Sequence, residues 1–406
     1  MTLRSGFTLW PAGTVVLEKP PHVKAFITQI AGFLPNAAVP NEDIEKVLGQ
    51  AGARPSMTRR RVLQANGIKA RHYAIDPVTG AQTHTNAQLA AEAVRRLQER
   101  SGLPLASDLA LLSCGTATAD QLIPSHGSMV HGELRAAPCE IVSMAGACCT
   151  GITALKYAAL AVGAGEHPRA VVTASELTSP LMRASHFAPE LASRAAALEE
   201  HPTLAFEHDF LRWMLSDGAA AMLVEPEPVV RGKLPPLKIE WIDSLSFAGE
   251  SEVCMYHLAA KGKDGKLVSW KSVEESQWLK GGFFNMGQDA RMLSEMIGQL
   301  VGRKGLGAML KKHPMKVDDI DWFVSHHSSN FFLPEVHKRL AEVDLPIPPE
   351  RLFSTLSEQG NTGSASVFLS LEALAERGAL QKGQKLLVFV PESARFNVVY
   401  ALFTVQ

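Results

Sequence analysis

Two adjacent cysteines, Cys148 and Cys149, lie in a run of small residues at positions 144–152. A short apolar segment precedes this run, and apolar residues at helical spacing follow it from Ile152 onward. The pattern predicts a turn between a strand and a helix, with a thiol at the helix N-terminus. Unpaired backbone N–H groups and the helix dipole favour a thiolate there, the form that attacks a carbonyl carbon. Buried cysteines more often pack without reacting, so a structural role stays open.

A second candidate is the histidine pair His326 and His327, which follows an apolar segment and precedes a helical pattern. A histidine at the end of a strand can donate a hydrogen bond to a substrate carbonyl or accept a proton near neutral pH. A capping or packing role is an equally good interpretation for either histidine alone.

A third candidate is Asn361, in a glycine-rich turn at residues 359–366 that precedes a helical pattern. The turn lacks the Gly-Lys-Ser/Thr of a phosphate-binding loop, and its plain interpretation is a turn with a helix N-cap. An asparagine amide beside a histidine can, however, hold an enolate or thioester oxygen. A cysteine, a histidine and an asparagine thus each precede a predicted helix.

The elements that must position these residues alternate short apolar segments with longer helical ones, which indicates an α/β layered fold. Residues 225–228, Glu-Pro-Glu-Pro, and the proline pair at 235–236 interrupt this alternation. The same alternation then resumes, so we predict two duplicated halves, residues 1–228 with the cysteine and residues 229–406 with the histidine and asparagine. Strands are expected at residues 23–30, 109–113, 169–174, 219–224, 237–242, 322–324, 386–390 and 398–405, and helices at 41–48 (with Asn41 as N-cap), 86–100, 290–300, 332–340 and 365–376.

Two segments between these elements are rich in polar and aromatic residues, at positions 187–213 and 247–284. Segments of this kind either line a substrate site or cover a partner subunit, although a surface excursion is an equally good interpretation.

The composition describes a folded protein of 406 residues, with 46% hydrophobic and 20% charged residues. Its net charge of −1 provides no global field for nucleic acid or an anionic membrane. Residues 1–21 lack the pattern of a secretion signal, and no apolar run is long enough to span a bilayer. Five cysteines without CxxC spacing favour reduced thiols over a zinc site, and therefore a cytoplasmic protein.

Several motifs together resemble the thiolase-fold condensing enzymes, and within them the beta-ketoacyl-acyl-carrier-protein synthase III branch. Residues 147–152, Ala-Cys-Cys-Thr-Gly-Ile, resemble the family's A-C-x-G-F nucleophile motif. Residues 321–326 resemble its DW-x-x-PH motif, and residues 360–366 closely resemble its GNT-x-AS motif. Residues 66–72 and 215–221 are similar to its TGI-x-x-RH turn and to the GDGA-A strand that closes its first half. The resemblance spans most of the chain.

The resemblance implies a thiolase-like fold, in which two duplicated α/β halves form an α-β-α-β-α layered architecture. Its register selects Cys149 as the acylated nucleophile, with Cys148 as a packing neighbour. It also selects His326 over His327 and assigns His326 and Asn361 to stabilising a negative oxygen. A thiolase would bring a second cysteine near its C-terminus as a base, and no cysteine follows Cys254.

The implied reaction is a Claisen condensation of a cysteine-bound acyl group with a malonyl- or beta-ketoacyl-thioester on acyl carrier protein, in fatty-acid or polyketide-type secondary metabolism. Residues 209–214 and 326–329 look more like the longer relatives of secondary metabolism than like the fatty-acid initiator. Some of these relatives make cyclohexanedione or dialkylresorcinol precursors. Acyl-CoA or acyl-carrier-protein thioesters are the expected substrates, without a cofactor or metal, and a homodimer is expected. Two alternatives stay open: an acyltransferase that passes the acyl group to an amine or alcohol, and an inactive subunit that shapes a partner's pocket.

The sequence departs from the family in two places. Its C-terminal glycine triplet is replaced within residues 391–396, where the backbone N–H of Ser393 or Ala394 would serve the oxyanion. Arg61 stands in place of a tryptophan of the coenzyme-A-binding helix, which weakens the expectation of free acyl-CoA as the primer. The basic residues that could meet a phosphopantetheine phosphate or an acidic carrier protein, or that are simply solvated, are Arg59, Arg60, Arg61, Lys338 and Arg339.

Overall fold

The computed structural model of this chain describes residues 24–51, 59–193, 211–262 and 264–406. The prediction about a secretion signal in residues 1–21 lies outside the described residues, as does most of the insertion predicted at 187–213.

One sheet of ten strands crosses the molecule, in the order β14-β13-β15-β16-β8-β1-β7-β6-β4-β5. In each half, the strand that comes first in the sequence pairs antiparallel with the strand that comes last. The last strand also pairs antiparallel with the sheet strand that precedes it in the sequence. Two parallel pairs join the remaining strands of each half. The halves meet where β1 pairs with β8 at Phe26 with Lys238 and Ile27 with Leu237. The strands are β1 (Phe26–Phe33), β4 (Leu111–Thr116), β5 (Glu140–Ala145), β6 (Ala170–Glu176) and β7 (Gly218–Glu225), then β8 (Leu237–Ser246), β13 (Trp322–Ser325), β14 (Leu352–Phe353), β15 (Lys385–Glu392) and β16 (Asn397–Val405).

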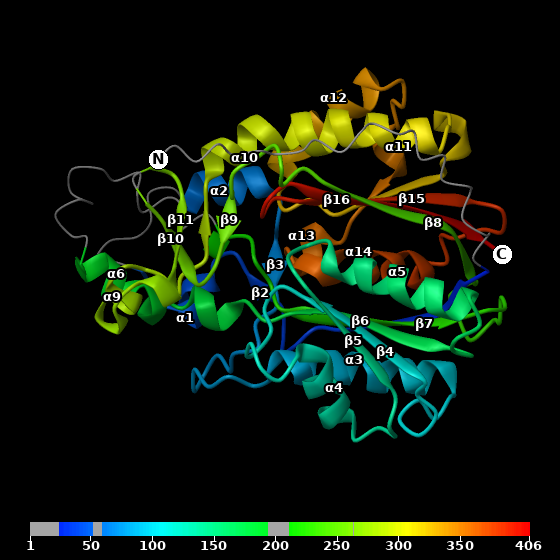
Figure 1. The fold of residues 1–406 in the computed structure, drawn as a ribbon, viewed down its shortest axis with the longest axis horizontal. Coiled ribbons are helices and arrows are strands. Elements are labelled where there is room, and N and C mark those ends of the chain that lie inside the picture. Colours follow the sequence, from blue (N-terminus) through cyan, green and yellow to red (C-terminus); the bar gives the residue numbers. More distant parts are fainter. Residues whose placement is uncertain (1–23, 52–58, 194–210, 263) are drawn as a thin grey trace, which may run out of the picture.

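Helices form three layers around the two half-sheets, as Figure 1 shows. Two helices lie between the half-sheets, two cover the outer face of the first half, and three cover the outer face of the second half. The predicted α-β-α-β-α architecture of two duplicated halves is therefore confirmed. These helices are α5 (Thr150–Gly163) and α14 (Ser366–Glu376) in the middle, α3 (Asn86–Ser101) and α4 (His126–Leu134) on the first half, and α10 (Ala290–Ile297), α11 (Leu306–Lys312) and α12 (Leu333–Glu342) on the second.

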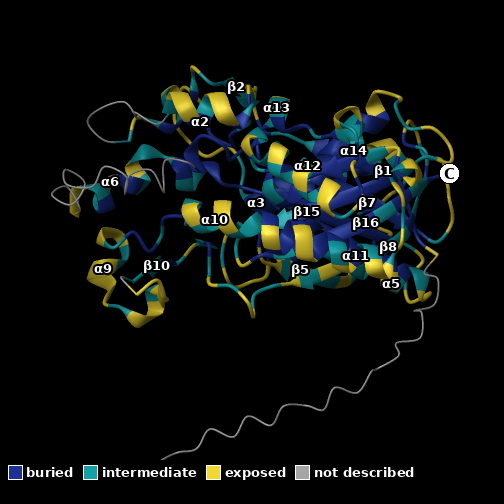
Figure 2. Ribbon diagram, turned by 90° about the horizontal axis from the view of Figure 1, so that it is seen from above, coloured by how far each residue is buried: buried dark blue, intermediate teal, exposed yellow. Residues whose placement is uncertain are grey.

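The position of each layer follows from its apolar residues. The central helices α5 and α14 bury leucine, isoleucine, valine and phenylalanine side chains in one cluster with both half-sheets. A helix that is apolar around most of its circumference needs cover on both sides, which the middle layer provides. Figure 2 shows the central strands buried and the exposed residues gathered on the outer elements. None of the described helices has the length and apolar character needed to cross a membrane.

Most predicted elements form within a few residues of the expected bounds, with two instructive exceptions. Helix α1 (Ile44–Leu48) begins after Asp43, so the predicted N-cap was wrong: the Asn41 side chain instead donates to the Ile68 carbonyl at 2.9 Å. Helix α10 ends at Ile297 and continues as a π-helical segment, η4 (Gly298–Gly305).

Shorter strands, helices and 3₁₀ turns lie between these long elements along the chain. They are β2 (Val39–Pro40), β3 (Ala70–Arg71), β9 (Met255–Tyr256), β10 (Ala259–Lys261), β11 (Leu267–Ser269), β12 (Gly287–Gln288), α2 (Arg59–Asn66), α6 (Ala184–Ser193), α9 (Glu275–Lys280), α13 (Leu356–Gln359), and the 3₁₀ turns η1 (Ser179–Met182), η3 (Trp270–Ser272), η5 (Val317–Asp319), η6 (Asn330–Phe332), η7 (Pro349–Arg351) and η8 (Gly363–Ala365).

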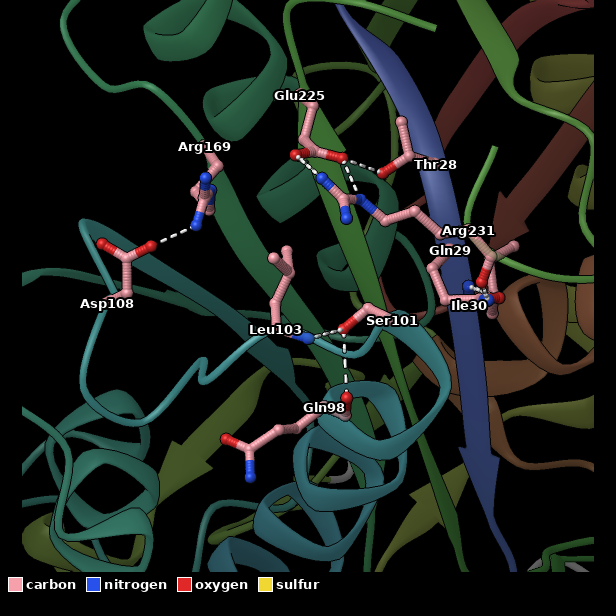
Figure 3. Close-up of polar contacts among 10 residues, drawn as sticks. All are labelled: Thr28, Gln29, Ile30, Gln98, Ser101, Leu103, Asp108, Arg169, Glu225 and Arg231. Atoms are coloured by element: carbon pink, nitrogen blue, oxygen red, sulfur yellow. Dashed lines mark hydrogen bonds and ion pairs between the residues drawn. The ribbon is translucent and has the colours of Figure 1, made fainter. Parts of the chain in front are cut away.

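The proline-rich connector between the halves folds back onto β1 and β7 (Figure 3). Arg231 donates two hydrogen bonds of 2.7 Å to the Glu225 carboxylate, which also accepts the Thr28 hydroxyl at 2.7 Å. The Gln29 side chain donates to the Arg231 carbonyl at 2.7 Å. The predicted boundary at residues 228 and 229 lies in this connector and stays a prediction.

A glycine brings the two halves into backbone contact beside the cysteine turn. A Cβ placed on Gly151, in the first turn of α5, would lie 2.6 Å from the Ser364 carbonyl oxygen and 2.8 Å from the Ala174 Cβ. Only a residue without a side chain permits this approach, so Gly151 sets how closely the cysteine turn lies against the asparagine turn.

We expect Gly151→Ala to lower the free energy of unfolding by about 1–3 kcal/mol, because backbone and a β-strand side chain must move to admit one methyl group. Urea denaturation measures this change. The control is Gly132→Ala in α4, where a Cβ meets nothing within 4 Å. That variant should be neutral or more stable by up to ~1 kcal/mol, since alanine favours the helix. Equal effects of the two substitutions would contradict the close-packing argument.

Candidate active site

The cysteine turn has the predicted local structure. Strand β5 ends at Ala145, and Cys149 is the residue immediately before α5, with its thiol and its backbone both buried. The Cys149 sulfur lies 3.3 Å from the Val390 carbonyl oxygen, and the Cys149 N–H donates to the Glu392 carboxylate at 3.2 Å. The nucleophile candidate thus contacts the end of β15 in the other half.

The prediction that the helix N-terminus favours a thiolate was wrong for this resting structure. Burial raises the pKa of the Cys149 thiol well above its ordinary value, and the Glu392 carboxylate and Cys148 raise it further. Burial also raises the pKa of Cys148, with contributions from Glu392 and Glu176. A desolvated site with a full negative charge outweighs the partial positive charge of a helix end. Both thiols are protonated at neutral pH.

One cavity reaches from the cysteine turn to the space beneath α10, η4 and α12. Three predicted positions line it: Cys148, His326 and Asn361. Of the two adjacent cysteines, Cys148 is the one that lines the cavity. The Cys149 sulfur is instead directed at the Val390 carbonyl. Cys148 is therefore more than the packing neighbour expected from the motif. Most other lining residues are apolar, among them Leu211, Met214, Leu215, Met255, Met286, Leu293, Ile297, Val301, Leu306, Phe323, Phe332, Val336, Leu340 and Phe389.

His326 directly follows β13 and extends its pairing, since its N–H donates to the Phe389 carbonyl at 2.9 Å. Burial, and secondarily His327, lower the pKa of His326 to about 3. The imidazole is therefore neutral at neutral pH and suits hydrogen-bond donation better than proton uptake. His327 also lines the cavity, and its Nε2 lies 3.1 Å from the Asn330 amide oxygen.

Asn361 is fixed by its own backbone and side chain. Its N–H donates to the Met214 carbonyl at 3.0 Å, and its carbonyl accepts the Ser216 N–H at 2.9 Å. The side-chain oxygen accepts the Gly363 N–H at 3.0 Å. This bond orients the amide so that the Nδ2 group is the one available to a ligand, and it has no recorded acceptor in the described ranges. Asn361 and His326 together offer two neutral N–H donors to the cavity.

The sequence prediction missed Glu176, the last residue of β6. Its buried carboxylate accepts the Ser364 hydroxyl and the Thr118 hydroxyl at 2.7 Å each, and the Ala117 N–H at 3.1 Å. Burial raises the pKa of this carboxyl, although the hydrogen bonds lower it. Glu176 lines the cavity and ties three segments together around it. An acidic residue ending an apolar strand is the signal that could have identified it.

Ser393 and Ala394 lie in the turn between β15 and β16, at different positions relative to the cavity. Ser393 lines the cavity, and its hydroxyl accepts the Gln288 side-chain amide at 3.0 Å. The Ala394 carbonyl accepts the N–H groups of Cys254 at 2.9 Å and Met255 at 3.2 Å. That the backbone N–H group of Ser393 or Ala394 stabilises the oxyanion stays a prediction.

The three arginines do not act as one patch. Arg59 is half-buried: it pairs with Glu45, donates to the Asn41 carbonyl at 2.9 Å, and lies 5.4 Å from the centre of the Trp213 ring. It holds α2 on the body of the chain, which corrects its assignment to a landing patch. Arg60 and Arg61 are exposed.

The second basic pair is also divided. Lys338 is exposed on α12. Arg339 lines the cavity, but Glu335 and Glu342 neutralise it through ion pairs of 2.5 and 2.7 Å. Of this pair, Lys338 is the residue better placed to meet a partner in solution.

Comparison with known proteins agrees with this geometry. The family model of the 3-oxoacyl-[acyl-carrier-protein (ACP)] synthase III C-terminal region matches residues 310–390, which include His326 and Asn361. Beta-ketoacyl-[acyl-carrier-protein] synthase III of Rhizorhabdus wittichii is 23% identical over 370 residues, covering 90% of this chain and 94% of the relative. The chain is therefore similar to synthase III over most of its length.

Solved structures share the fold of this chain. AbyA1, described as a tetronic acid condensing enzyme, has a TM-score of 0.71 and 18% identity over 94% of this chain and 99% of AbyA1. A variant of OleA from Xanthomonas campestris with bound lauric acid and lauroyl-CoA has a TM-score of 0.68 and 20% identity over 94% of this chain and 99% of OleA.

We expect the chain to lose stability as the pH falls from about 6.5 toward 3, in part because of His326. Its pKa is depressed in the folded state, so the unfolded chain binds an additional proton across this window. Each such proton costs about 1.4 kcal/mol per pH unit. His326→Gln should flatten the pH dependence of the free energy of unfolding, measured by urea denaturation. Burial also lowers the pKa of His126, to about 4. His126 should therefore still make the free energy of unfolding of the variant depend on pH. An unchanged slope in the variant would refute the buried, neutral state of His326.

Proposed function

We propose that this chain forms a carbon–carbon bond by Claisen condensation. A cysteine of the turn accepts an acyl group from a thioester and joins it to a malonyl- or beta-ketoacyl-thioester on acyl carrier protein. One observation carries the proposal: the cysteine turn of the first half and His326 and Asn361 of the second meet at one largely apolar cavity. The name of the relative from Rhizorhabdus wittichii, beta-ketoacyl-[acyl-carrier-protein] synthase III, supports a reaction of this kind.

The two steps use different properties of the site. In the first, a thiol displaces the carrier thiol from the acyl thioester, which divides a difficult bond formation into two easier reactions. In the second, loss of carbon dioxide or a proton leaves negative charge on the oxygen of the second thioester. The neutral N–H donors of His326 and Asn361 can stabilise that oxygen, and their bonds strengthen as the charge develops. The thioesters supply every reacting group, so we propose no cofactor or metal.

We further propose that the apolar end of the cavity, beneath η4 and α12, holds the acyl chain. Leu293, Val301 and Phe323 are among its lining residues, and the long glycine-containing π-helical segment forms one wall. Supporting this assignment, the OleA variant of similar fold was crystallised with lauric acid and lauroyl-CoA. A fatty-acid or polyketide-type pathway would provide such acyl groups.

Partner and compartment are proposals of the same kind. Strand β5 is the outermost strand of the first half-sheet, and its residues are partly exposed, which supports a homodimer that covers this edge. All five cysteines are unpaired, which supports a reducing, cytoplasmic compartment.

Incubation with an acyl thioester should add one acyl group to Cys149, as peptide mass spectrometry can map. Cys149→Ala should abolish the added mass, because the motif register makes Cys149 the nucleophile. Cys148→Ala is the matched control and should retain acylation, although its side chain lines the cavity. An acyl group on Cys148, or one that survives in Cys149→Ala, would overturn the assignment.

His326→Ala and Asn361→Ala should reduce condensation by about 10²–10³-fold each, the usual cost of losing one oxyanion donor. Both variants should keep self-acylation within a few-fold of wild type, since the donors act on the second thioester. Product analysis by mass spectrometry gives both rates. His327→Gln should lose far less, and a larger loss there than in His326→Ala would reverse the histidine assignment. An ester or amide product without a new carbon–carbon bond would favour the acyltransferase alternative.

A further inference from the structure

A buried carboxylate lies directly against the candidate nucleophile. Glu392 is 4% exposed, at the end of β15, and one of its oxygens accepts the Cys149 N–H at 3.2 Å. The Glu392 carboxylate is also close enough to the Cys149 thiol to raise its pKa. The other Glu392 oxygen accepts the Asn397 side-chain amide at 2.6 Å, across the hairpin in which the two residues pair. Two neutral donors therefore hold the carboxylate beside the sulfur.

In the described part of the chain, no cationic side chain is among the groups that shift the pKa of Cys149. The titratable groups that influence Cys149 and its neighbour Cys148 are Glu392 and Glu176, and Tyr400 also lies near enough for Cys149 to raise its pKa. No ion pair to Glu392 is found within the described part of the chain. A protonated thiol is a weak nucleophile, so acyl transfer at neutral pH needs a group that removes the proton.

His326 is poorly suited to that task because burial keeps its pKa near 3. Glu392, in contrast, has a carboxylate oxygen 3.2 Å from the Cys149 nitrogen, and no ion pair engages it among the described residues. Along β15 its neighbours Pro391 and Ser393 line the cavity, whereas Glu392 points to the opposite face, toward α5. The carboxylate can therefore reach the sulfur without occupying the space of the substrate.

We propose that Glu392 is the general base for acylation of Cys149, with Asn397 as its positioning residue. As the Cys149 sulfur bonds to the thioester carbonyl carbon, its proton passes to Glu392, and the bond from that carbon to the carrier sulfur breaks. The carrier thiolate then takes the proton, so Glu392 returns to its carboxylate form and no further reactant is consumed. This inference rests on the proposed function, because it concerns its first step.

The test compares Glu392→Gln with wild type in two measurements. Single-turnover acylation, followed by intact-protein mass spectrometry at pH 7, should slow by about 10²–10⁴-fold, the usual contribution of a general base. Alkylation of Cys149 by iodoacetamide, mapped by peptide mass spectrometry across pH 6–10, should move to lower pH, because a neutral amide no longer disfavours the thiolate. The opposite directions of these two effects separate a base from a structural residue, whose loss would not produce them together.

Three further variants make the result decisive. Glu392→Asp keeps the charge and should recover part of the acylation rate, even if Glu392→Gln folds poorly. Asn397→Ala should slow acylation less than Glu392→Gln, because the base is retained but less well oriented. Glu225→Gln is the matched control: Glu225 is another buried glutamate, bound to Arg231 and Thr28 (Figure 3), and its loss should leave acylation and the alkylation profile unchanged.

Unchanged acylation in Glu392→Gln, or an unchanged alkylation profile, would overturn the base assignment alone. If wild type accepts no acyl group from any thioester, the proposed function and the base assignment both fail. The two failures are distinguishable, since the first occurs in an enzyme that still forms its acyl intermediate.

Discussion

The close approach of α5 to the turn at residues 363–365 is the contact on which the site depends. Gly151 allows the helix to lie against the Ser364 carbonyl, and Glu176 binds the Ser364 hydroxyl and N–H from the neighbouring strand. Backbone packing and a buried carboxylate thus hold the two halves together at one point. Cys149 precedes this contact by two residues and Asn361 precedes it by three, so the contact fixes the relation between them.

The electrostatic character of the site follows from its burial. Two carboxylates, Glu176 and Glu392, lie near the cysteines, and the imidazole of His326 is neutral. The cysteine thiols and the His326 imidazole of this site are therefore uncharged at rest. Its neutral donors interact most strongly with charge that appears during reaction, which is the property that accelerates a chemical step. The largely apolar lining of the cavity strengthens these interactions, because a medium of low polarity screens charge weakly.

The two halves share one strand order but contribute different residues to the site. Both halves use the same strand order, yet the first contributes the cysteine turn and Glu176 and the second contributes His326, Asn361 and Glu392. The two half-sheets enclose α5 and α14, so each catalytic candidate lies at the end of an element anchored in the core. The outer helices of the second half close the apolar part of the cavity.

Much of the local structure was predictable from the sequence, because it depends on short-range patterns. Helix α3 formed where apolar periodicity placed it, and the cysteine, histidine and asparagine each precede the expected helix or turn. The motifs identified Cys149, His326 and Asn361 as one set, and the last two indeed line one cavity with Cys148.

The sequence by itself thus determined which elements form and which residue types end them, since periodicity and turn chemistry act within a few residues. Tertiary structure alone decided that Cys148 rather than Cys149 lines the cavity, that Arg59 pairs with Glu45, and that Glu392 binds the Cys149 N–H. Residue pairs such as Cys149 and Glu392, 243 positions apart, meet only through the packing of both halves. The protonation of the thiols and of His326 follows from that same burial, because the cost of removing charge from water depends on everything that surrounds the group.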